Sequence, residues 1–118
     1  MRSTVISVIL FFLLVGGVAL NGFFVRDVSD TLTQRAEALE EPSDEKLNSL
    51  EAYWSGSRPW LELSISDSYL DSVEKAIIAM RSAYELGEEK EYMRQLALFR
   101  QAAKSVKKAE QISLRSIL

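Results

Sequence analysis

The sequence predicts an all-α protein in which an N-terminal transmembrane helix is followed by a small antiparallel, up-and-down helical bundle. Three observations support this prediction: an uncharged apolar run at residues 5–25, apolar residues that recur every three or four positions further along the chain, and no useful alternation of β-branched and polar residues. Residues 26–118 are enough for one small hydrophobic core and too few for two.

Residues 5–25 have the length and composition of a membrane-spanning helix. Fifteen of these 21 residues are Val, Ile, Leu or Phe, and none is charged. At about 1.5 Å per residue the segment spans roughly 31 Å, against about 30 Å of hydrocarbon. The fifteen apolar residues contribute on the order of −5 to −9 kcal/mol to insertion. We therefore expect residues 5–25 to contact membrane lipid.

A cleaved signal peptide is the alternative interpretation, with Arg2 as its positive region and residues 17–19 as a cleavage site of small residues. Removal would release a secreted soluble bundle. Against cleavage, hydrophobicity resumes at residues 23–25 and a helical pattern follows at once. We expect residues 1–25 to stay as an uncleaved signal-anchor helix of a single-pass cell-membrane protein. The short N-terminus is expected to be cytoplasmic and the bundle, residues 26–118, extracytoplasmic.

A proline turn separates the first two helices of the bundle. Apolar residues at steps of three and four extend the membrane helix over about residues 26–41, until Pro42 interrupts it. Ser43 is the expected N-cap of a second helix over about residues 43–65. That helix should be kinked near residues 56–59, which include a glycine and a proline.

The last two helices are expected to form a hairpin. The third, about residues 67–86, ends before Gly87, the residue type expected just past a helix C-terminus. The fourth, about residues 88–112, begins with acids that suit a helix N-terminus. A short connection makes the two helices antiparallel. Their facing stripes are Leu70, Val73, Ile77, Met80 and Tyr84, and Tyr92, Leu96, Phe99, Ala103 and Val106.

The residue types argue against an enzyme. Without Cys or His the chain has no disulfide, no thiolate or imidazole metal ligand and no usual base for a serine nucleophile. It also has no phosphate loop or dinucleotide fingerprint. The acid-rich segments 37–45 and 87–92 lie at expected helix ends, where solvated carboxylates are the ordinary interpretation and cation binding is the alternative. We expect no cofactor, no metal and no nucleic-acid partner.

Three residues around the expected kink, Trp54, Arg58 and Trp60, are candidate interaction residues. One interpretation is core packing around the kink. The other is a ligand-stacking pocket or an interfacial aromatic belt.

Charge is unevenly distributed along the chain. Residues 26–91 carry seven Lys or Arg against sixteen Asp or Glu, whereas residues 92–118 carry six against one. The basic last helix either pairs with the acidic earlier helices, at about 0 to 1 kcal/mol per exposed pair, or approaches the bilayer. There each cation contributes about 1 kcal/mol near anionic headgroups. The cations concerned are Lys104, Lys107, Lys108 and Arg115.

The C-terminal segment is too apolar for a free terminus. Leaving its large apolar side chains in water forfeits about 1.5 to 3 kcal/mol each relative to full burial. We expect this segment to dock on the membrane-proximal end of the bundle, on the lipid surface or on a partner's membrane-adjacent face. The apolar residues are Ile112, Leu114, Ile117 and Leu118.

Both ends of the chain resemble a known family. The start MRSTVISVILFFLLVGGV, the acidic helical segment, Trp54 and the ending EQISLRSIL are similar to a small single-pass bacterial membrane-protein family, catalogued as domain of unknown function 4363. Residues 56–59 depart from a helix that is usually continuous in that family. The resemblance implies a multi-spanning membrane protein as partner and supplies no catalytic residues.

Two classes of function stay open. One is an accessory or scaffold protein of the bacterial envelope that binds a membrane-protein partner. The other is a free-standing surface helical module that binds a peptide, a polymer or a small ligand near Trp54 and Trp60. The sequence indicates neither the partner's identity nor the oligomeric state.

Overall fold

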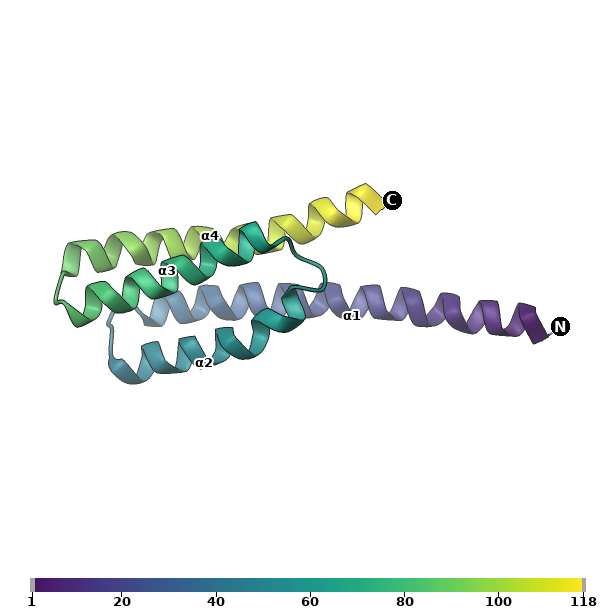
Figure 1. Cartoon of the computed structure of the whole chain (residues 1–118), viewed down its shortest axis with the longest axis horizontal. Helices are drawn as coiled ribbons and strands as arrows, with labels where there is room; N and C mark the ends of the chain where they lie inside the picture. Colours follow the sequence, from purple (N-terminus) through teal and green to yellow (C-terminus); the bar gives the residue numbers. More distant parts are fainter. Residues whose placement is uncertain (1, 118) are drawn as a thin grey trace.

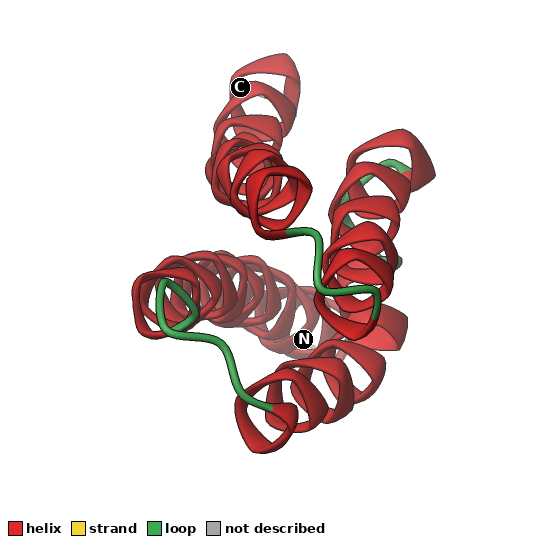
Figure 2. Cartoon of the chain, turned by 90° about the vertical axis from the view of Figure 1, so that its left-hand side faces the viewer, coloured by secondary structure: helices red, strands yellow, loops and turns green. Residues whose placement is uncertain are grey.

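Four helices make up almost the whole of the part of the chain that the structure, a computed structural model, describes, residues 2–117 (Figure 1). Consecutive helices run antiparallel, and the last returns beside the first, so that the four enclose one core, as Figure 2 shows end on. The predicted all-α fold with an N-terminal helix of transmembrane length is confirmed. The helices are α1 (Arg2–Ala38), α2 (Asp44–Leu61), α3 (Asp67–Glu85) and α4 (Glu89–Ile117).

One unbroken helix, α1, has an exposed apolar N-terminal half and a C-terminal half that is buried on one face. Its large apolar side chains from Val5 to Val15, together with Leu20 and Phe23, are between 47% and 72% exposed. From Val25 onward one face of the same helix is buried in the bundle. Within residues 2–117, α1 is the one helix long and apolar enough to span a membrane. The change from exposed to buried apolar residues occurs without a break in the helix.

The core is built around α4, which packs most extensively against α3 and then against α1. Small buried residues let these three helices approach closely. By contrast, the buried face of α2 consists mostly of large side chains, which hold its backbone farther from its neighbours. The small residues are Ala36, Ala76, Ala83, Ala102, Ala103 and Ala109, and the large ones on α2 are Leu47, Leu50, Trp54 and Leu61.

Two predicted helix ends have the expected local chemistry. The Oγ of Ser43 accepts a hydrogen bond from the Lys46 N–H at 3.2 Å, which caps α2. Gly87 has a φ of 72°, a conformation that side chains with a Cβ rarely adopt. The N–H groups of Gly87 and Glu88 donate to the carbonyls of Tyr84 and Ala83 at 3.2 and 2.9 Å. These two bonds end α3 and set the direction of the hairpin.

The C-terminal end of α2 differs from the expected end at residue 65. The helix continues through Pro59 and ends at Leu61. Pro59 cannot donate to the carbonyl of Ser55, but both residues are exposed, so water can satisfy that carbonyl. A proline one turn from a helix end therefore does not stop the helix here.

The ends of α1 and α4 also differ from the expected bounds. α1 ends at Ala38 instead of near residue 41, and the Lys46 ammonium donates to the carbonyls of Ala38 and Glu41 at 3.1 and 2.8 Å. α4 continues past the expected end at residue 112 to Ile117. The additional turns of α4 extend beyond the bundle toward the N-terminal half of α1 (Figure 1).

The neighbouring isoleucines of α3 provide a matched test of the core. Ile77 is 3% exposed and Ile78 is 62% exposed. We expect Ile77→Ala to destabilise the full chain by about 2 to 5 kcal/mol, because it leaves a cavity against α4. Ile78→Ala should stay within about 0.5 kcal/mol of the parent chain. Thermal unfolding in detergent, followed by circular dichroism, measures both, and equal melting temperatures would mean that the buried face is misassigned.

Candidate functional site

Arg58 joins α2 to α3 through three carboxylates. Its Nε donates to Glu62 at 3.0 Å and its Nη2 to Asp71 at 2.8 Å. Its Nη1 lies 3.0 Å from one oxygen of Glu74 without the alignment of a hydrogen bond, and the Trp54 indole donates to the other oxygen at 3.4 Å. The hydrogen bonds that Arg58 donates to Asp71 and Glu62 raise its pKa above the usual value. The guanidinium therefore pairs with all three carboxylates, and two of its nitrogens, Nε and Nη2, make hydrogen bonds.

The structure brings Trp54 and Arg58 together and leaves Trp60 apart from them. Trp54 is 3% exposed and belongs to the hydrophobic core, whereas Trp60 is 63% exposed. A stacking pocket would need both indole rings to face one hollow. Because Trp54 is enclosed and Arg58 is paired, the geometry favours core packing for these two residues and leaves Trp60 free for an external contact.

A second arginine, which the sequence reasoning missed, ties the opposite end of α3 to α2. Arg81 Nε donates to Glu51 at 3.0 Å, its Nη1 donates to Asp44 at 3.3 Å, and its Nη2 donates to Asn48. The one available signal was its place beside Met80, at the edge of the apolar stripe. Arg58 and Arg81 thus hold the two ends of the contact between α2 and α3.

A third guanidinium lies between α1 and α2. Arg35 Nη1 donates to the Ser49 hydroxyl at 2.7 Å, and its guanidinium carbon lies 4.9 Å from the centroid of the Tyr53 ring. Charged and polar contacts therefore line both sides of α2. They are partly exposed, so salt weakens them more than it weakens the apolar contacts of the other helices.

The basic residues of α4 divide between internal pairs and free cations. Lys107 Nζ lies 3.9 Å from Asp30, and Arg100 donates to Glu40 at 2.9 Å, which are the internal pairs expected between a basic α4 and an acidic α1. Lys104 and Lys108 are exposed. The side chains of Ile112, Leu114, Arg115 and Ile117, and the whole of Leu118, lie outside the described part of the chain.

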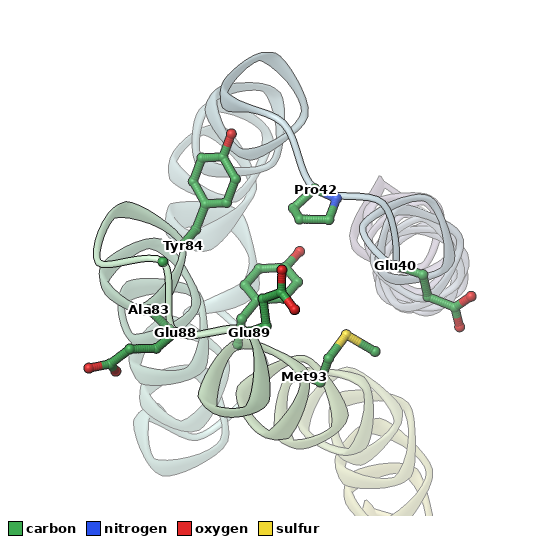
Figure 3. Close-up of a pocket in the computed structure, with 9 residues that line it drawn as sticks. Glu40, Pro42, Ala83, Tyr84, Glu88, Glu89 and Met93 are labelled. Atoms are coloured by element: carbon green, nitrogen blue, oxygen red, sulfur yellow. The ribbon is translucent and has the colours of Figure 1, made fainter.

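An open hollow of about 360 Å³ lies at the end of the bundle farthest from the N-terminus (Figure 3). Tyr84, Pro42 and Met93 surround it; the carboxylates of Glu40 and Glu88 point away from it, whereas that of Glu89 points toward its middle. No group of three acidic side chains among residues 2–117 is placed to hold a metal ion. The hollow therefore offers a mainly apolar and aromatic surface, with the Glu89 carboxylate beside it, at the turns of the bundle.

Beside this hollow, Tyr92 fastens α4 to the end of α1. Its hydroxyl donates to the Leu39 carbonyl at 2.6 Å, and the residue is buried. Burial raises the pKa of Tyr92 to about 12, because the phenolate would be poorly solvated there. The neutral phenol is the form that the fold stabilises.

We expect Arg58→Gln to destabilise the chain by about 1 kcal/mol, because Glu62, Asp71 and Glu74 lose their common cation. Arg94→Gln is the matched control: Arg94 is 67% exposed and pairs with Glu91 on the same helix, so its loss should leave the melting temperature almost unchanged. Thermal unfolding at low and high salt measures both. Equal effects of the two changes would contradict a special role for Arg58.

Tyr92 predicts a loss of stability in alkaline solution. Its pKa in the fold, about 12, exceeds the ordinary value of 10, so its contribution is complete below pH 10 and is lost as the pH rises toward 12. Tyr92→Phe should lower the free energy of unfolding by about 1 kcal/mol at neutral pH through the lost hydrogen bond. From pH 10 to 12 the stability of this variant should fall less steeply than that of the parent chain. Thermal unfolding across this range measures the difference; parallel curves would contradict it.

Comparison with known proteins identifies the sequence family of this helical chain. No curated protein and no solved structure matches it. The sequence model of the family described as Domain of unknown function (DUF4363) matches residues 26–117, which is the whole bundle and the C-terminal turns of α4. The match confirms the family that the resemblance named, and it begins after the apolar N-terminal run of residues 5–25. The chain belongs to the DUF4363 family.

Proposed function

We propose that the protein is a membrane-anchored, non-enzymatic accessory or scaffold protein of the bacterial envelope that binds a membrane-protein partner. One observation is the main support: α1 is a single helix whose exposed apolar half leads directly into its core-facing half. No flexible linker lies between the two halves. A bundle on such a helix is held at a fixed height and orientation relative to the bilayer, which suits a protein that positions another.

The outer face of α3 and α4 is a surface suited to a partner's helix. A hollow of about 520 Å³ runs between these two helices and is lined mainly by small and polar residues, among them Ala76, Ala79 and Ala102. Leu98 also lines this hollow and is 45% exposed. Small residues beside an exposed aliphatic side chain allow an added helix to approach closely.

The proposal includes an uncleaved α1, a cytoplasmic N-terminus and an extracytoplasmic bundle. The part of α1 in the bundle core begins at Val25, so cleavage after Ala19 would leave the core intact. A soluble bundle is for this reason compatible with the same fold, and the mature N-terminus has to be measured.

The hollow lined by Tyr84 and Met93, at the end of the bundle farthest from the N-terminus, favours a second candidate function, a free-standing surface module that binds a peptide, a polymer or a small ligand. Its apolar and aromatic lining, with Tyr84 and Met93, faces away from the N-terminal half of α1 (Figures 1 and 3). A ligand held there would not need a membrane partner.

Site-specific photo-crosslinking of the full chain in its native membrane distinguishes the two candidates. A crosslinker at Leu98 should give one defined adduct with a membrane protein, whereas the matched exposed position Ala52 on α2 should give none. Mass spectrometry of the purified chain should find the N-terminus upstream of residue 19. A lone monomer that crosslinks from neither position would contradict the scaffold proposal, and a chain that begins at Leu20 would contradict the anchor.

A further inference from the structure

We infer that the membrane-proximal end of the bundle is a lipid-binding surface that rests on the bilayer, with Trp60, Leu63 and Lys108 at the boundary between hydrocarbon and headgroups. We call these three residues the basal surface. This inference rests on the proposed membrane anchoring through α1. It adds a second contact with lipid, made by the bundle itself.

The register of α2 against α1 sets the height of Trp60 and Leu63. Arg35 contacts Ser49, and the two helices run antiparallel (Figure 1). Eleven residues further along α2, at about 1.5 Å per residue, Trp60 is therefore about level with residue 24 of α1. Leu63 follows in the turn after α2. The end of α2 thus lies where the exposed apolar part of α1 meets its buried part.

The register of α4 against α1 gives the same height for Lys108. The Ser29 hydroxyl donates to the Ala103 carbonyl at 2.8 Å. Five residues later on this antiparallel helix, Lys108 is also about level with residue 24. The backbone of residues 110–117 continues for about 12 Å toward the N-terminal half of α1 (Figure 1). The segment that includes Ile112, Leu114 and Ile117 in the sequence is therefore carried to the depth of the apolar run.

The chemistry of the basal surface matches that height. A hydrocarbon span over residues 5–25 ends at this level, and tryptophan is enriched at the membrane boundary. Trp60 is 63% exposed and Leu63 is 77% exposed, an apolar exposure that water disfavours and the interface accepts. Glu62 between them pairs with Arg58 at 3.0 Å, so its charge is offset. Lys108 is exposed at headgroup height.

The absence of cysteine from the sequence allows a direct test with single introduced cysteines. Leu63→Cys and Leu86→Cys form a matched pair, because Leu63 and Leu86 are 77% and 69% exposed at opposite ends of the bundle (Figure 1). Each full-length variant is labelled with an environment-sensitive fluorophore and reconstituted in phosphatidylcholine vesicles. Some of the vesicles carry lipid brominated near the headgroup end of its acyl chains. Alkaline extraction of the same vesicles reports membrane insertion independently.

We expect the label at residue 63 to lose emission in brominated vesicles and to resist aqueous iodide. The label at residue 86 should show the opposite behaviour. Intrinsic fluorescence gives a label-free measurement: brominated lipid should quench the parent chain, and Trp60→Phe, which keeps the buried Trp54, should lose most of that quenching.

Two results would overturn the inference, and they differ in what they mean for the proposed function. If both labels are open to iodide while the chain resists alkaline extraction, the bundle stands clear of the lipid and the anchor is retained. If alkali releases the chain, the membrane anchoring itself fails and the basal surface fails with it.

Discussion

The continuity of α1 is the constraint on which the rest of the structure depends. A single apolar segment that crosses a bilayer, as we propose for residues 5–25, must satisfy its own backbone hydrogen bonds as a helix, and α1 continues beyond that segment to Ala38 without a break. From Val25 its side chains change from mostly apolar on all sides to apolar on one face, and α4 and α2 pack against that face. The bundle therefore inherits its position from the helix that precedes it.

Within the bundle, small apolar residues and charged residues stabilise different helix contacts. Alanines let α1, α3 and α4 pack closely, and apolar burial holds those contacts at any salt concentration. The wider gap between α2 and its neighbours is filled by leucines and Trp54. Polar contacts at the edges of α2 come from Arg35 on α1, from Arg58 on α2 itself and from Arg81 on α3. Because partly exposed ion pairs contribute little and weaken with salt, α2 is the helix whose attachment depends most on solution conditions.

Sequence patterns predict most of this fold because the relevant forces are local or periodic. The apolar stripes identify Ile77 and Phe99 as buried, and Ser43 and Gly87 mark helix ends through backbone chemistry that only a few residue types provide. Pro59 does not break α2, because the carbonyl of Ser55 that it leaves without a donor lies at an exposed residue and can reach water. Arg81 is missed because its partners lie about thirty residues away on α2 and have no periodic signature.

The candidate surfaces were harder to predict, since each depends on how separate helices are placed. The sequence grouped Trp54 with Trp60 by proximity in the chain, yet six positions along α2 carry the first into the core and the second to the surface. Leu63 has no distinguishing pattern of its own. Leu63 becomes a candidate surface residue only because the antiparallel register brings the end of α2 to the level of Phe24, beside the exposed apolar part of α1. If residues 5–25 span a bilayer as proposed, the bundle continues directly from that span, so a tilt of the span would move the bundle as well. A contact between the bundle and the lipid surface would oppose such tilting, and the scaffold would then present its outer α3 and α4 face in one orientation.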